Sequence, residues 1–147
     1  MIIQRRYLVG GLVSALAIGG ALAFDLIGPA DPPDPLVLQF SRGTALVSGE
    51  EARLAAFAGR HVGEPLLDFH ILGHTGNRGD ADANLTLSQE RADAVAAALV
   101  QAGVPQDRIL SATGVGSADP LKVNTDESET GLQRRMARAV VTAVSRK

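Results

Sequence analysis

The chain has 147 residues, the length of one ordinary domain, and 46% of them are hydrophobic but only 3% aromatic. It has no cysteine, which excludes disulfides, thiolate nucleophiles, cysteine-ligated metals and lipid attachment to an N-terminal cysteine. Fourteen basic and 16 acidic residues leave a formal net charge of −2, which argues against nucleic-acid binding through a basic surface.

Residues 1–24 form a basic and then apolar segment that has two interpretations. Arg5 and Arg6 precede 18 residues without a charge, 7–24. The sequence Ala-Leu-Ala at 21–23 fits the cleavage site of a secretory signal peptide. The length of the apolar stretch equally fits an uncleaved membrane anchor helix with a cytoplasmic N-terminus. Either interpretation places the remainder of the chain in the periplasm, and the second tethers it to the inner membrane.

Residues 25–35 contain four prolines and one glycine, a composition that rules out a helix or a central strand. We expect this segment to be a short, stiff linker. It separates the signal or anchor segment from a domain at 36–147.

The first half of this domain is expected to alternate strand and helix. Residues 36–40 are an apolar stretch and predict a strand. Ser48 opens an S-x-x-E capping box, which predicts a helix running to about Arg60. A second strand is predicted at 66–72. The stretch 75–84, rich in Gly, Asp and Asn, predicts a loop.

The second half continues the alternation. Thr86 opens a T-x-x-Q capping box, and the amphipathic helix that follows is expected to end at Gly103. Residues 109–115 predict a third strand, and the polar stretch 118–131 predicts a long loop. The β-branched and alanine-rich stretch 136–144 predicts the last strand.

The order β-α-β-α-β-β predicts an α+β fold with helices on one face of a mixed sheet. The end of the chain is basic: no acid follows Glu129, whereas five cations do, namely Arg134, Arg135, Arg138, Arg146 and Lys147. We interpret them as charges that keep an edge strand soluble. The alternative is attraction to anionic wall polymer or lipid headgroups.

The stretch 73–92 carries the strongest motif. It has the sequence GHTGNRGDADANLTLSQERA and resembles the signature of the OmpA-like domain, G-H-T-D-x2-G-x4-N-x2-L-S-x2-R-A. Further matches follow in the expected order: Gly103-Val104, Arg108-Ile109, Gly114-x-Gly116, Asp119-Pro120, Asn124-Thr125 and Arg134-Arg135-Met136. The resemblance covers about 36–144, nearly all of the expected domain.

This resemblance implies an OmpA-like sandwich that binds the diaminopimelate of peptidoglycan stem peptides in the envelope of a Gram-negative bacterium. In the family, the arginine that matches Arg91 pairs with a diaminopimelate carboxylate, which a guanidinium can hold by two parallel hydrogen bonds. Thr75, Asn84 and Arg135 also match family positions and belong to the predicted site. Thr and Asn side chains in such loops commonly brace nearby backbone as well.

Gly76 departs from the family pattern, because the family has an aspartate there that holds the diaminopimelate ammonium. Without this carboxylate we expect affinity to fall by about ten- to a hundredfold, unless Asp80 or Asp82 compensates. Gln133 replaces a family asparagine. The alternative function is therefore a scaffold or accessory subunit of an inner-membrane or envelope complex, with weakened or lost peptidoglycan binding.

The sequence predicts no enzyme. His70 and His74 are four residues apart on a predicted strand, about 13 Å, which is too far to share a metal ion. The chain has no phosphate-binding glycine loop and no hydrolase or metalloprotease motif. We therefore expect no catalytic residue, no metal and no cofactor.

Overall fold

A computed structural model describes residues 33–146. The predicted signal or anchor segment at 1–24 and most of the predicted linker lie outside these residues. Within 33–146, no helix is both long enough and apolar enough to cross a bilayer.

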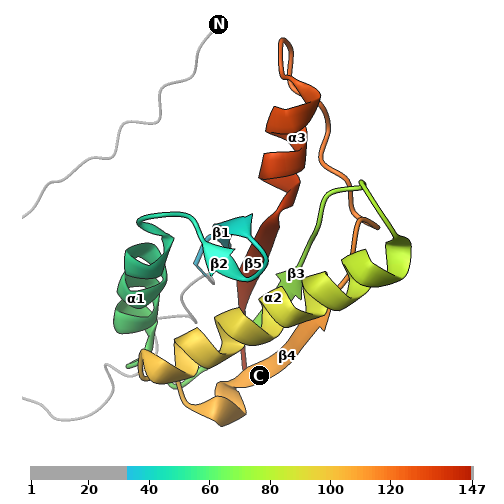
Figure 1. Ribbon diagram of the computed structural model, residues 1–147. Coiled ribbons are helices and arrows are strands. Elements are labelled where there is room, and N and C mark those ends of the chain that lie inside the picture. The colour runs from blue at the N-terminus through green and yellow to red at the C-terminus, as the bar shows by residue number, and fades with distance from the viewer. Residues whose placement is uncertain (1–32, 147) are drawn as a thin grey trace, which may run out of the picture. The chain divides into compact units, whose positions relative to one another are not determined.

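Five strands form one mixed sheet in the order β2-β1-β5-β3-β4 (Figure 1). Only β3 and β4 pair in parallel, and the other neighbours are antiparallel. The strands are β1 Leu36–Arg42, β2 Ala45–Leu46, β3 Leu67–Gly73, β4 Ile109–Gly114 and β5 Arg138–Ser145.

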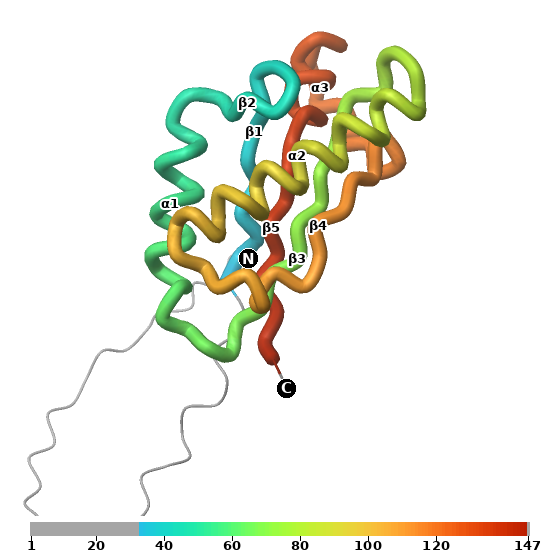
Figure 2. Tube along the Cα trace, turned by 60° about the horizontal axis from the view of Figure 1, so that its bottom comes forward, coloured from blue at the N-terminus to red at the C-terminus, as the bar shows by residue number. Residues whose placement is uncertain are grey.

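Two helices, α1 and α2, lie on the same face of this sheet (Figure 2). The short helix α3 directly precedes β5 and lies beyond the end of the sheet where that strand begins (Figure 1). The helices are α1 Glu50–His61, α2 Ala81–Gln101, the 3-10 turn η1 Gln106–Arg108 and α3 Glu129–Met136.

The core lies between this sheet face and the two long helices. Alternate residues of β1 point into it, so Leu38 and Phe40 are buried while Val37 is exposed on the other face. Phe69 from β3 and Leu99 from α2 meet them there, both with no exposed surface. Each such side chain contributes about 1.5–3 kcal/mol by leaving water, and this burial fixes α2 over the strands.

The predicted α+β class, with helices on one face of a mixed sheet, is confirmed, and every predicted strand within the described residues is present. The helix boundaries differ. Helix α2 begins at Ala81, earlier than predicted, because Asp80 and not Thr86 caps it: the Asp80 carboxylate accepts a hydrogen bond from the Ala83 N–H at 2.9 Å. At α1 the cap position is Gly49, with φ 90°, and no side chain caps the helix.

Helix α3 lies partly within the predicted loop 118–131. Ser128 caps it by accepting from the Gly131 N–H at 3.1 Å, and the helix has an acid in its first turn and two arginines in its last. Eight residues with few apolar side chains give no helical periodicity, so the pattern predicted a loop.

The prediction that β5 is an edge strand is wrong. It pairs with β1 on one side and β3 on the other, so it lies at the centre of the sheet. The basic residues in and directly after β5 pair with acids: Arg138 with Asp119 at 3.3 Å, and Arg146 with Asp68 at 2.5 Å.

Candidate ligand-binding site

The predicted site residues come from three elements that meet at the carboxyl end of β3. Thr75 and Gly76 directly follow β3, and Asn84 and Arg91 lie in the first half of α2. Arg135 lies on α3. The structure therefore brings most of the predicted site to one end of the sheet, although each residue has a different set of contacts there.

Helix α2 lies unusually close to the ends of β3 and β4, and two glycines permit this. A Cβ atom at Gly73 would collide with the carbonyl oxygen of Ser88, and one at Gly114 would collide with the backbone of Gln89. The side chain of Gln89 then ties the two elements together by accepting from the Gly114 N–H at 2.9 Å. This contact holds the first half of α2 over the site.

Arg91 reaches from α2 into the protein interior and is 5% exposed. Its Nη1 donates to the carbonyl of His74 at 2.8 Å, and its Nε donates to the carbonyl of Gly43 at 2.8 Å. The guanidinium also lies over the ring of Phe40, 4.9 Å from the ring centroid. Burial lowers the pKa of Arg91 from its usual high value, but an arginine stays charged at neutral pH.

The contacts of Arg91 leave one nitrogen, Nη2, without a hydrogen bond to any described residue, and no described carboxylate pairs with the group. Arg108 is an instructive contrast. It is also buried, but all three of its nitrogens donate to backbone carbonyls, those of Leu67, Val62 and His61. Every nitrogen of Arg108 is thus bonded to the backbone, whereas Arg91 has one nitrogen without a partner among the described residues.

Thr75 and Asn84 hold the loop that joins β3 to α2. The Thr75 N–H donates to the carbonyl of Gly116 at 2.9 Å, while its buried hydroxyl has no hydrogen-bond partner among the described residues. The Asn84 side chain donates to the carbonyl of Arg78 at 3.0 Å. Asn84 therefore braces the loop, as its residue type suggested, whereas the Thr75 hydroxyl is buried and unpaired among the described residues.

Gly76 adjoins a side chain from α3. A Cβ atom at Gly76 would collide with Oε1 of Gln133. That oxygen accepts a hydrogen bond from the Asn77 N–H at 3.1 Å, and Nε2 of Gln133 donates to the Asn77 side chain. The amide of Gln133 thus fills the space that a side chain at position 76 would enter. The sequence showed both departures from the family but not that they touch.

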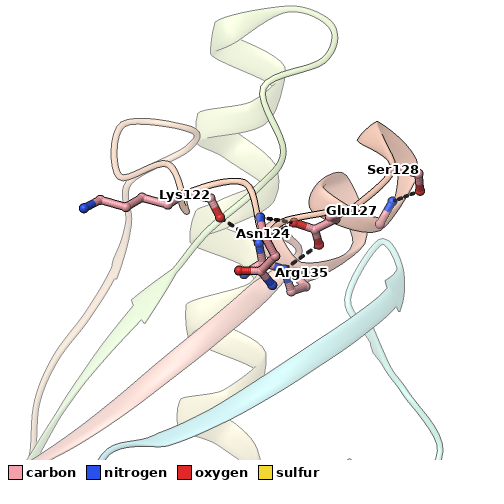
Figure 3. Close-up of polar contacts among 6 residues, drawn as sticks. Lys122, Asn124, Glu127, Ser128 and Arg135 are labelled. Atoms are coloured by element: carbon pink, nitrogen blue, oxygen red, sulfur yellow. Dashed lines mark hydrogen bonds and ion pairs between the residues drawn. The ribbon is translucent and has the colours of Figure 1, made fainter.

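Arg135 makes an ion pair that shapes the segment before α3 (Figure 3). Its Nε and Nη2 both donate to the carboxylate of Glu127 at 2.6 Å, and Nη2 also donates to the carbonyl of Lys122 at 2.8 Å. These bonds, with a further one from the Asn124 N–H, lower the pKa of Glu127 to about 2. In this structure the guanidinium of Arg135 is therefore bound to Glu127.

His74, Arg138 and Asp119 form a polar cluster beside the site. The spacing of residues in the sequence did not predict it. His74 is 2% exposed, and its backbone N–H donates to the carbonyl of Arg138. Burial lowers the pKa of His74, the charge of Arg138 lowers it further, and Asp119 opposes them. Neither Nδ1 of His74 nor Nη1 of Arg138 has a hydrogen-bond partner among the described residues.

The predicted acids of the loop also have structural contacts. Asp80 caps α2 through its carboxylate, and the carbonyl of Asp82 accepts from the Thr86 hydroxyl at 3.0 Å. Arg78 reaches across to Glu129 on α3 at 2.7 Å, an exposed pair that links the loop to that helix. His70 is bonded to Ser111 at 2.7 Å, and within 33–146 no group of three or more potential metal ligands comes together.

Comparison with known proteins supports the family resemblance. The chain is 38% identical over 72 residues to the probable lipoprotein YiaD of Escherichia coli, and 46% identical over 55 residues to the outer membrane protein A of Yersinia pseudotuberculosis. These matches cover 49% and 37% of this chain, but only 32% and 15% of the two relatives. The chain thus matches a minor part of each longer protein.

The structural comparison extends over more of the domain. The crystal structure of the peptidoglycan-associated lipoprotein from Burkholderia pseudomallei superposes with a TM-score of 0.64 at 26% identity, covering 74% of this chain and 89% of that one. The sequence pattern of the OmpA family matches residues 40–134, well over half of the chain. The chain therefore belongs to the OmpA family.

Proposed function

We propose that this domain is a non-enzymatic wall-binding module that holds a diaminopimelate-type stem peptide of peptidoglycan at the carboxyl end of β3. One observation carries the proposal: Arg91 is a buried, charged guanidinium with no carboxylate partner among the described residues and with Nη2 unbonded. A buried cation is costly unless an anion pairs with it. A ligand carboxylate supplies that anion. Arg91 bonds the carbonyl of His74, the residue before Thr75, whose buried hydroxyl is also unpaired among the described residues.

The test is co-sedimentation of the full chain, in mild detergent, with purified diaminopimelate-type sacculi. Arg91→Lys keeps the positive charge but loses the forked donor geometry, so its affinity is expected to fall about tenfold or more. Arg60→Ala removes an exposed arginine at the end of α1 and serves as the control, with unchanged binding. Equal binding by wild type and Arg91→Lys, with both proteins folded by circular dichroism, would contradict the proposal.

A second candidate function is a scaffold or accessory subunit in an envelope complex. The filled space beside Gly76 favours it, because Gln133 lies where a ligand-binding side chain would project. Such a subunit should co-purify with other membrane proteins from detergent-solubilised membranes, whatever the residue at position 91. Purification of the chain alone under these conditions counts against this candidate.

We place the domain in the periplasm, held near the inner membrane if residues 1–24 are retained as an anchor. The peptidoglycan proposal supports this placement, because its ligand lies in that compartment. Protease added to spheroplasts should degrade the domain, and intact cells should protect it. Protection in spheroplasts would contradict a periplasmic location.

A further inference from the structure

The strongest unassigned feature of the site is the contact between Gly76 and Gln133. The two residues are 57 positions apart, yet a single added carbon at Gly76 would collide with the Gln133 amide oxygen. The same amide bonds Asn77 twice, through its oxygen to the backbone N–H and through its nitrogen to the side chain. The two residues therefore form one structural unit.

This unit is electrically neutral where the resemblance places a carboxylate. The groups that bond Asn77 are the two halves of a carboxamide, and two ion pairs flank them: Arg78 with Glu129, and Arg135 with Glu127. An ammonium held here would lose water without gaining a counter-charge, which is unfavourable. The neutral site is unsuited to a free amine.

The amide of Gln133 keeps unused hydrogen-bonding capacity. A primary carboxamide has two N–H donors and two acceptor lone pairs, and the bonds to Asn77 use one of each. The remaining N–H and lone pair complement a secondary amide, which offers one carbonyl and one N–H. A secondary amide is also uncharged, so it matches the neutral surroundings.

We propose that Gln133 determines ligand specificity at this site: it replaces recognition of a free amine by recognition of an acylated one. The inference rests on the proposed wall-binding function and names its substrate class, stem peptides whose diaminopimelate amine is acylated, as in a peptide cross-link. Arg91 holds the carboxylate in this scheme, and Gln133 contacts the amide beside it.

The structural part of the inference has its own test in thermal melting of the full chain. Gly76→Ala in the wild-type background must displace the Gln133 amide and break its bonds to Asn77, so the melting temperature is expected to fall by about 4 °C or more. In a Gln133→Ala background the same change meets no obstacle, so it should leave the melting temperature unchanged or raise it slightly. Equal effects in both backgrounds would show that the residues are not coupled.

The ligand part is tested by co-sedimentation with two batches of sacculi, one untreated and one whose free amines have been acetylated with acetic anhydride. Wild type should bind both batches within about a factor of two, whereas the double variant Gly76→Asp/Gln133→Asn should favour the untreated batch by about tenfold. A wild type that binds only untreated sacculi would overturn the specificity inference and leave wall binding intact. A wild type that binds neither batch would overturn the proposed function and the specificity inference together.

Discussion

Arg91, Arg108 and Arg138 are buried, and their hydrogen-bond partners differ. Each nitrogen of Arg108 donates to a backbone carbonyl, and these bonds tie the end of α1 to β3. Arg138 pairs with an acid, Asp119, whose side chain is 73% exposed. Arg91 has carbonyl partners on two nitrogens only. Among the described residues, Arg91 therefore differs from Arg108 in having a nitrogen without a partner, and from Arg138 in having no paired acid.

His74 provides a prediction at this scale, because it is buried beside the cation of Arg138. Burial first, and Arg138 second, lower its pKa below the ordinary 6.5. In the unfolded chain His74 gains a proton near pH 6.5, whereas in the folded chain it does so only at lower pH. The free energy of unfolding should therefore fall as the pH drops below about 6.5. Nuclear magnetic resonance titration of the His74 ring should give a midpoint below 6.5.

The matched variant is His74→Gln, which cannot titrate and should remove this part of the pH dependence. A midpoint for His74 at or above 6.5 would contradict the buried, neutral ring described above.

At the scale of elements, the position of α2 depends on its close approach to β4. Gly114→Ala would place a carbon against the backbone of Gln89, which cannot move as a flexible side chain can. We expect the free energy of unfolding to fall by about 2–3 kcal/mol, measured by urea denaturation. Gly59→Ala, in the last turn of α1 where an added Cβ meets no neighbour, is the control and should raise stability by up to about 0.5–1 kcal/mol. Similar effects at both positions would show that the close approach is not required.

The segment before α3 depends on the ion pair between Arg135 and Glu127. Because these bonds hold the pKa of Glu127 at about 2, its ionised form stabilises the fold fully above the ordinary pKa of 4.5. That contribution is lost as the pH falls from about 4.5 toward 2. Glu127→Gln should therefore be less stable than wild type at pH 7, with the two unfolding curves converging near pH 2.

The control for this comparison is Glu90→Gln, an exposed position on α2. It should leave the difference from wild type constant between pH 7 and pH 2. A Glu127→Gln difference that is equally constant would mean that the ion pair does not stabilise the folded chain.

The elements also show which parts of the structure could be predicted. Strands such as β1 and β5 were predictable because apolar and β-branched residues cluster in them. Helix α3 was not, because eight mostly polar residues owe their helical state to the Ser128 cap and to the Arg135 pair beside them. The early start of α2 was missed because the prediction took Thr86 as the capping residue, whereas Asp80, six residues earlier, caps the helix.

For the whole molecule, the sequence predicted the fold class but not the order of the strands. The basic residues at the end of the chain indicated an edge strand, whereas β5 lies between β1 and β3. The acids that pair with Arg138 and Arg146 are Asp119 and Asp68, which are distant from them in the sequence. The contact of Gly76 with Gln133 has the same origin. Pairings across such distances depend on topology, which local patterns do not determine.

The fold also has a groove that none of the predicted site residues lines. This groove of about 470 Å³ lies between α1, α2 and the β1–β2 hairpin, lined largely by alanine and leucine side chains. It has no arginine in its lining and suits an apolar ligand better than a carboxylate. A stem peptide should therefore leave this groove unaffected.

The most direct measurement is a nuclear magnetic resonance titration of the full chain, in detergent, with a stem tripeptide that ends in diaminopimelate and whose diaminopimelate side-chain amine is acetylated. The account predicts saturable shifts of the Arg91 Nε–H, of the Thr75 to Asn77 backbone amides and of the Gln133 side-chain amide, with little change in the groove between α1 and α2. Shifts confined to that groove, or no saturable shift at any concentration, would contradict it.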